Sequence, residues 1–360
     1  MKKIVRQLII GSLVGVIFPF QLSAMDDWQT ISNEDAGFSW DVGERLDEAV
    51  KNNDLENLHS VLVVRNSRLV FERYYEGYNQ VWGMPVEKIT FTADTLHDMQ
   101  SIAKSIVSLL YGIALAEGKV PSIETPVVDA FPEFTDLAID PDRRRIKIKH
   151  VLSMTMGLEW HEEWNNNWNK MVLGPDQYRD LLSLPVVAEP GTTWNYSAGA
   201  NALLRYLIKQ GVGKTLLEYA QEKLFIPLAI TEVEWRSDLR MKPRDLARVG
   251  QLVLNQGSWK GVQLIPTEWL RSSFTESASV SESVSYGFQW WLGRVQRTND
   301  QWTNSKLGTD RWIAGLGLWK QGLVILSGHQ LVVVINARNY TDPKLISRIM
   351  LEYVLPGLSN

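Results

Sequence analysis

Residues 101–118 read SIAKSIVSLLYGIALAEG, and this segment predicts a long apolar helix that opens on a serine. Its apolar side chains recur at helical spacing, and Gly118 is typical of a helix end. The positions that give this period are Ile102, Ile106, Leu109, Leu110 and Ile113. Ser101 and Lys104 are one turn apart, so their side chains share one face of the helix.

The Ser101–Lys104 pair has the layout of a nucleophile beside a base. A serine hydroxyl attacks a carbonyl only when a neighbouring group takes its proton, and a lysine can do so where burial lowers its pKa from about 10.4. Apolar neighbours such as Met99 and Ile106 favour that burial, and a helix start favours an oxyanion. Roughly one S-x-x-K tetrad occurs by chance in a chain of this length. The alternative interpretation is therefore a plain N-cap serine followed by a surface lysine.

A second segment, 190–197, reads PGTTWNYS and places Tyr196 in a turn before a helix expected over 198–210. Such a tyrosine can hold a proton between the nucleophile, a lysine and the leaving group. The alternative is a tyrosine that only packs.

The order of the predicted elements indicates an α+β fold. Helices are expected over 42–52 and 344–354, and residues 121–275 read mostly as helices and loops. The predicted strands fall at both ends of the chain: 60–65, 69–75, 286–292, 323–326 and 331–336. We therefore expect a sheet built from both chain ends, with the helical insertion forming the other wall of a cleft.

The composition excludes several classes of protein. The 360 residues carry 37 basic and 41 acidic side chains, so no nucleic-acid partner is expected. The absence of cysteine excludes disulfides, zinc–thiolate sites, iron–sulfur clusters and a cysteine nucleophile. The five histidines show no metal-ligand spacing, and neither a metal nor another cofactor is expected.

Residues 1–24 have the layout of a secretory signal peptide. Three basic residues precede an apolar run over 8–18, and small residues at 23 and 24 allow cleavage. The run is short for a bilayer-spanning helix, although an uncleaved anchor is the alternative. We expect a periplasmic or secreted protein, without a membrane span after cleavage and with a net charge of −7 in place of −4. Residues 25–57 would form a lead-in with the first helix.

Together these features resemble the serine hydrolases of the class C β-lactamase and penicillin-binding-protein superfamily, over about 58–354. The resemblance rests on segments in the family's order: 101–104, 150–158 (HVLSMTMGL), 190–197, 241–248 (MKPRDLAR), 286–291 (YGFQWW) and the final strands. It implies an antiparallel sheet flanked by helices with a mostly helical insertion, and a β-lactamase-like hydrolase domain over 58–355. It also implies Ser101 as the acylated nucleophile, Lys104 as its activator and Tyr196 as the general acid/base.

Two departures from the family pattern bear on the substrate. The second motif of these β-lactamases is Y-x-N, and Ala198 stands where the asparagine is expected. The third motif, K-T-G, has two candidates: Lys306 in the segment 306–309 (KLGT), and the segment 313–317 (IAGLG). We favour the second, in which Ala314, Gly315 and Gly317 line the oxyanion hole with backbone groups, as in the esterase and 6-aminohexanoate-dimer-hydrolase-like branches.

The loop 159–168 is rich in tryptophan, and in the family it overhangs the cleft. Trp160, Trp164 and Trp168 could grip an acyl chain or a peptide, or could pack structurally.

The sequence thus predicts an exported serine hydrolase that cleaves an ester or amide of a small-molecule or peptide substrate through an acyl-serine. One alternative is a D-alanyl-D-alanine carboxypeptidase or β-lactamase. An alternative of another class is a non-catalytic sensing module with the same fold.

Overall fold

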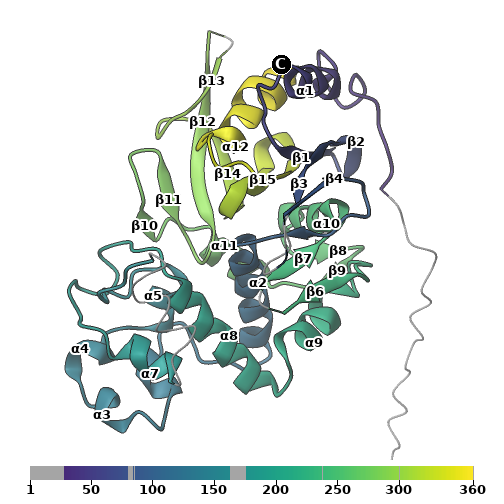
Figure 1. Ribbon diagram of the computed structural model, residues 1–360. Coiled ribbons are helices and arrows are strands. Elements are labelled where there is room, and N and C mark those ends of the chain that lie inside the picture. Colours follow the sequence, from purple (N-terminus) through teal and green to yellow (C-terminus); the bar gives the residue numbers. More distant parts are fainter. Residues whose placement is uncertain are drawn as a thin grey trace, which may run out of the picture.

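The computed structural model describes residues 28–79, 84, 86–162, 176–236, 238–299 and 301–359. Helix α2 (Ile102–Ala116) lies between the large sheet and the helical region (Figure 1). Its residues from Ile102 to Ala114 are all buried, as expected for a helix that is packed on every side. The helix predicted from the segment 101–118 is therefore confirmed, with Ser101 at its N-cap.

A nine-stranded antiparallel sheet forms the other main layer, in the order β10-β11-β12-β14-β15-β16-β1-β2, with β13 paired to β12. Its strands are β1 (Leu58–Arg65), β2 (Arg68–Tyr74), β10 (Ala278–Ser279), β11 (Val284–Tyr286), β12 (Trp291–Thr298), β13 (Gln301–Asn304), β14 (Asp310–Gly317), β15 (Gln321–Leu326) and β16 (Leu331–Ala337). The two chain ends meet where β1 pairs with β16, for example at Val61 and Ile335. The predicted α+β sheet built from both ends is confirmed.

Both faces of this sheet are covered, because successive side chains along a strand point to opposite sides. Val334 and Leu323 belong to the core shared with α2 and α10 (Pro243–Leu254). Val333 and Val324 belong to the core on the other face. That second face carries α1 (Val42–Lys51) and a closing helical segment, α12 (Leu345–Arg348) continued by a π-helical stretch over Ile349–Val354.

Further helices and small sheets complete the described part of the fold, with α8 and α11 packed against α2. The helices are α3 (Thr135–Ala138), α4 (Pro141–Arg144), α5 (Ile148–Leu152), α7 (Gln177–Leu182), α8 (Ala198–Val212), α9 (Leu216–Ala220) and α11 (Thr267–Ser273). The small sheets pair β3 (Glu76–Asn79) with β4 (Glu87–Thr90), β7 (Leu239–Met241) with both β5 (His97–Asp98) and β6 (Val233–Trp235), and β8 (Ser258–Trp259) with β9 (Val262–Gln263). Within the described ranges, no helix has the length and apolarity needed to cross a bilayer.

The strand predicted over 286–292 is broken in the structure. Residues 287–290 leave the sheet between β11 and β12, and Gln289 has a positive φ of 65°. The Gln289 amide Nε2 donates to the carbonyl of Leu152, at 2.8 Å, and the Gln289 carbonyl accepts from Ser105 Oγ, also at 2.8 Å. These long-range contacts tie the segment to α5 and α2, so tertiary packing overrides the local strand propensity.

Two buried histidines, His59 on β1 and His97 on β5, lie next to Phe91. His59 stacks on Phe91 with ring centroids 3.8 Å apart, and His97 stacks on the same ring at 4.9 Å. Burial lowers the pKa of His59 to about 3 and holds the pKa of His97 well below its usual value. Both imidazoles are therefore neutral in the folded protein at neutral pH.

Because both imidazoles are buried in the neutral form, we expect the protein to lose stability in acid. Below about pH 6.5 these histidines bind protons in the unfolded chain but stay neutral in the folded protein. As the pH is lowered, the free energy of unfolding therefore falls by up to about 1.4 kcal/mol per pH unit for each histidine. Urea unfolding between pH 7.5 and 4.5 measures this slope. His97→Leu should reduce the slope relative to the wild type. Equal slopes in His97→Leu and the wild type would contradict the assignment.

Candidate active site

Ser101 and Lys104 form a direct pair at the start of α2. The Lys104 amine Nζ donates a hydrogen bond to Ser101 Oγ at 2.9 Å. Lys104 is only 9% exposed, so it is not a surface lysine. Ser101 occupies the N-cap position, but its side chain makes no capping hydrogen bond. The geometry therefore matches the nucleophile–base layout and disagrees with the plain N-cap interpretation.

The turn before Ser101 is strained and held in place. Gln100 has a φ of 51°, a left-handed conformation that is costly for a residue with a side chain. Its backbone N–H donates to Asp238 Oδ2 at 3.0 Å. The neighbouring Met99 N–H donates to the carbonyl of Leu239, at 2.8 Å, which continues the β5–β7 pairing up to the site.

Asp238 is a half-buried carboxyl fixed by backbone groups. Its Oδ1 accepts from the Leu239 N–H at 2.8 Å, so each oxygen receives one backbone donor. Burial raises the pKa of Asp238 to about 6, against the opposing effect of these two N–H groups. The carboxylate thus acts as a clamp on the turn that carries Ser101.

Tyr196 lies beside the lysine, as expected from the second motif. The Lys104 Nζ is 5.0 Å from the centre of the Tyr196 ring. That ring stacks on Trp291 with centroids 6.1 Å apart, and Trp194 packs edge-on against Trp291 at 5.6 Å. Tyr286 completes this group against Trp291, at 5.2 Å. An aromatic wall therefore fixes the orientation of Tyr196 next to the Ser101–Lys104 pair.

The strand that lies against the start of α2 is β14, at its glycines. A Cβ added to Gly315 would lie 3.1 Å from Ser105 Oγ, and one added to Gly317 would lie 2.6 Å from the Met99 carbonyl oxygen. At Gly317 a side chain would collide with the backbone, whereas at Gly315 the Ser105 side chain would have to move by a few tenths of an ångström. Of the two third-motif candidates, the structure brings the segment 313–317 to Ser101.

Lys306 lies at the other end of this strand. It is exposed in the turn between β13 and β14. Strands rise by about 3.3 Å per residue, which puts Asp310 roughly 16 Å from Gly315, and Lys306 lies beyond Asp310. The structure therefore does not bring Lys306 together with the other candidates.

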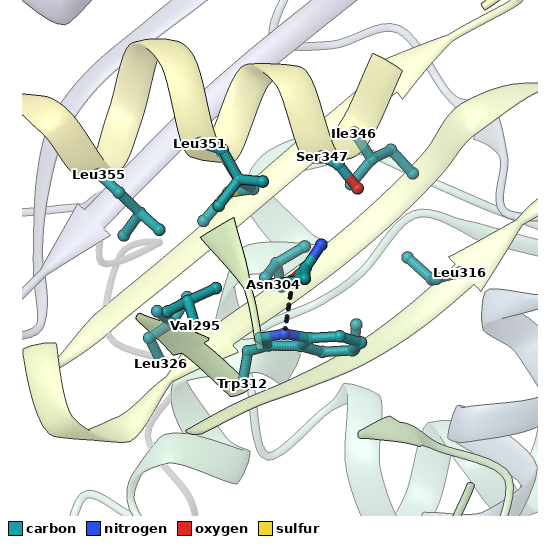
Figure 2. A pocket seen from close by; sticks show the side chains of 12 residues that line it. Val295, Asn304, Trp312, Leu316, Leu326, Ile346, Ser347, Leu351 and Leu355 are labelled. Atoms are coloured by element: carbon teal, nitrogen blue, oxygen red, sulfur yellow. Dashed lines mark hydrogen bonds between the residues drawn. The ribbon is translucent and has the colours of Figure 1, made fainter. Parts of the chain in front are cut away.

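Behind β14 lies an apolar cavity of about 70 Å³ (Figure 2). Ala314, Leu316 and Trp312 line it from the sheet, and Ile346 and Leu351 line it from the closing helical segment. Along β14, Trp312, Ala314 and Leu316 point to the face opposite to Gly315. The cavity therefore lies on the face of β14 turned away from Ser101. Ala314 therefore contributes only backbone atoms to the site.

The tryptophan-rich loop reaches the site through its first residues. Trp160 is buried, and its indole Nε1 donates to Glu162 Oε2 at 2.7 Å. The same oxygen accepts from the Ala198 N–H at 2.8 Å. Trp164 and Trp168 lie outside the described residues. In the described part of the chain, no three His, Asp or Glu side chains are grouped as a metal site requires.

Comparison with known proteins agrees with this geometry. The family model described as beta-lactamase matches residues 59–348. The chain belongs to the beta-lactamase family. As a member of this family the protein is a serine hydrolase, which sets aside the interpretation as a non-catalytic module.

Relatives in this family carry different activities. The chain is 22% identical over 339 residues to 6-aminohexanoate-dimer hydrolase of Paenarthrobacter ureafaciens, covering 84% of this chain and 76% of that enzyme. It is 28% identical over 134 residues to lovastatin esterase of Penicillium rubens, a match that spans 33% of each chain. A class C β-lactamase crystallised with cefoxitin has the same fold, with a TM-score of 0.64 at 15% identity, covering 88% of this chain and 96% of that one.

Several residues of the site were not found from the sequence. Glu162 and Asp238 belong to no motif, and their hydrogen bonds to the Ala198 and Gln100 N–H groups form only in the folded chain. Trp194 and Trp291 lie inside the segments 190–197 and 286–291, but the sequence did not assign them to the wall beside Tyr196. The one available signal for Glu162 was its place in the loop that the family resemblance positions over the cleft.

The clamp on Gln100 predicts a kinetic effect of Asp238→Ala. A hydrogen bond to a charged group contributes about 1.5–3 kcal/mol, so its loss should slow labelling by a fluorophosphonate at least about tenfold. Asp94→Ala is the matched control, because the Asp94 side chain is 87% exposed. Stopped-time mass spectrometry gives the labelling rates, and circular dichroism checks folding. An unchanged rate in folded Asp238→Ala would show that the clamp does not position Ser101.

Proposed function

We propose that this protein is an exported serine hydrolase that cleaves esters or amides through an acyl-Ser101 intermediate. The observation that carries the proposal is the partly buried hydrogen bond of 2.9 Å from Lys104 Nζ to Ser101 Oγ. A serine hydroxyl needs a positioned base before it can attack a carbonyl, and this amine occupies that position.

The proposed reaction has two halves. Neutral Lys104 takes the proton of Ser101 Oγ as that oxygen attacks the substrate carbonyl, and Tyr196 passes a proton to the leaving group as its bond to the carbonyl breaks. Water then attacks the acyl-Ser101 ester, with the same groups accepting its proton and returning one to Ser101 Oγ.

The oxyanion would be held between α2 and β14. The N–H groups of Ile102, Ala103 and Lys104 already donate to the carbonyls of the preceding residues 99–101. The Ser101 N–H is therefore the donor that this end of the helix can offer. A backbone N–H from the segment 313–317 is the proposed second donor, since Gly315 and Gly317 lie against α2 and the preceding turn.

The same strand argues for esters or simple amides over β-lactams. Residues 313–317 supply no cation for a substrate carboxylate, and Lys306 lies at the far end of β14. The curated relatives that bear names of esterases and of an amide-cleaving dimer hydrolase support this preference.

Export is part of the proposal. Residues 1–24 carry the basic, apolar and small-residue regions of a signal peptide. The mature chain recovered from a periplasmic fraction would begin at Met25, which N-terminal sequencing tests. A chain that keeps residues 1–24 and sediments with membranes would instead support the uncleaved anchor.

Covalent labelling tests the roles of Ser101 and Lys104. A fluorophosphonate should add its mass to the peptide that contains Ser101, and Ser101→Ala should not be labelled. Lys104→Arg keeps the charge but cannot deprotonate, so labelling should slow by at least about 100-fold. Lys119→Arg, at an exposed lysine just after α2, should label at the normal rate. Labelling of another residue, or normal rates in Lys104→Arg, would refute these assignments.

Substrate preference is tested by comparing p-nitrophenyl butyrate with nitrocefin. Each missing charge-assisted contact to the β-lactam carboxylate weakens binding by about 1.5–3 kcal/mol. The ester has no carboxylate, so its binding does not depend on such contacts. We expect a much higher kcat/KM for the ester than for nitrocefin. Lys306→Ala should not change the ratio of these two kcat/KM values. Two results together would reverse the choice of third motif: a kcat/KM for nitrocefin equal to that for the ester, and a lower kcat/KM for nitrocefin in Lys306→Ala.

A further inference from the structure

The cavity behind β14 has the chemistry of a small apolar binding site. Its volume is about 70 Å³. Among the described residues that line it, polar side-chain atoms come only from Asn304, Trp312 and Ser347. Two of these atoms are already paired, since the Trp312 indole N–H donates to Asn304 Oδ1 at 3.2 Å. A buried water needs about two to four polar partners, so these walls favour an apolar occupant.

The cavity reaches the surface beside the end of β13. Trp312 and Ile346 are half-buried, and Asn304 is exposed, so the lining runs from the core to solvent. Figure 2 shows the Trp312 ring as one wall, with Leu351 pointing toward it from the closing helical segment. A small molecule therefore has a route to the cavity through this half-buried rim.

The helical wall of the cavity has an irregular geometry. Met350 and Leu351 belong to the π-helical stretch Ile349–Val354, in which each hydrogen bond spans five residues instead of four. Such stretches are rare and occur frequently at functional sites. Leu351 and the following Leu355 both line the cavity opposite β14. The cavity thus lies at the part of the helical segment that departs from α-helical geometry.

The volume decides which apolar group fits. An engineered cavity of about 150 Å³ binds benzene, a ring of six carbon atoms. The cavity behind β14 has about half of that volume, which is enough for a chain of about three carbon atoms but not for an aromatic ring. Ser347, half-buried at one end, offers a hydroxyl to a polar group attached to such a chain.

Strand β14 connects this cavity to the proposed oxyanion site. Ala314 and Leu316 line the cavity, while Gly315 between them packs against Ser105 on α2. A group that fills the cavity therefore supports the backbone that presents the proposed oxyanion donor. Oxyanion donors are most effective when they are held in place before the reaction. Packing on the far face of β14 should therefore favour acylation of Ser101.

We propose that this cavity is an effector site for the linear alkyl end of a small neutral molecule, and that its occupation raises the rate of Ser101 acylation by fixing β14. Short-chain alcohols, which ester cleavage releases, have this chemistry. The binding itself does not depend on the proposed function, whereas the effect on acylation rests on it.

Methyl NMR with 1-alkanols tests the binding. Ethanol through 1-hexanol are titrated into the folded protein, and the methyl signals of Leu316, Ile346 and Leu351 are followed. We expect saturable shifts and a Kd that falls about fourfold with each added methylene until the chain reaches about three or four carbons. Ser101→Ala should bind equally well, because the cavity lies on the other face of β14. Shifts that do not saturate, or that spread through the whole core, would overturn the site.

Two substitutions separate the cavity from general effects of alcohol. Leu351→Phe adds a ring to the wall and should weaken 1-butanol binding at least about tenfold. Leu307→Phe is the matched control and should bind normally, because Leu307 is 88% exposed in the turn before β14. If Leu351→Phe does not fold, Ser347→Leu fills the same space from the preceding turn. Normal binding in a folded filling variant would show that 1-butanol binds elsewhere.

The rate of inactivation by a neutral fluorophosphonate tests the effect on acylation. Saturating 1-butanol should raise this rate at least about twofold in the wild type and in Leu307→Phe, and should not change it in Leu351→Phe. An unchanged rate in the saturated wild type would overturn the effector role. A fall in rate that persists in Leu351→Phe would overturn it as well, because 1-butanol would then compete at Ser101.

Ser101→Ala separates this inference from the proposed function. Inactivation that is lost in Ser101→Ala, together with an unchanged rate in the saturated wild type, rejects only the effector role. Inactivation that survives in Ser101→Ala rejects the acyl-Ser101 mechanism and the effect on acylation with it, while the NMR titration still decides whether the cavity binds an alkyl chain.

Discussion

The hydrogen bond between the Lys104 amine and the Ser101 hydroxyl is the interaction on which the rest of this structure depends. A buried amine loses its hydration, and an unpaired buried charge is strongly disfavoured. The fold meets this constraint by placing the Ser101 hydroxyl and the Tyr196 ring against the amine, with the carboxyls of Glu162 and Asp238 farther out in its electrostatic surroundings. Each comes from a different element, so the sheet, the helical region and the loops must all be in place before the site exists.

The backbone around Ser101 shows how this enclosure is built. Gln100 adopts a costly conformation that turns the chain from β5 into α2, and the β5–β7 pairing with Asp238 holds it there. On the other side, the glycines of β14 remove the side chains that would keep the strand away from the helix. The strained Gln100 backbone and the glycines within β14 are each locally unfavourable. They persist because the surrounding packed core stabilises this arrangement.

The sequence predicted the elements whose signal is local. The helix from Ser101, the hairpin of β1 and β2, and the strands β15 and β16 follow from their apolar period and turn residues, and the structure confirms them. Most of β12 and all of β13 were missed, and β14 was expected only through the family resemblance at 313–317, because segments such as 293–304 mix charged, polar and aromatic residues without clear alternation. Gln289 and Glu162 were beyond such reasoning for another reason: their partners lie far away in the sequence. The pairing of Ser101 with Lys104 was predictable, since both stand on one helical turn, whereas the choice between Lys306 and Gly315 needed the course of β14 in space.

The pairing of β1 with β16 has a consequence for how the chain reaches its folded state. Residue 61 must find residue 335, and such distant contacts slow folding because a long loop must close first. As the chain emerges from the ribosome, the β1–β2 hairpin appears early with one edge unpaired. That edge is a template for association with other chains until the last thirty or so residues arrive. Biogenesis of this hydrolase is therefore expected to depend on protection of its β1–β2 hairpin during synthesis.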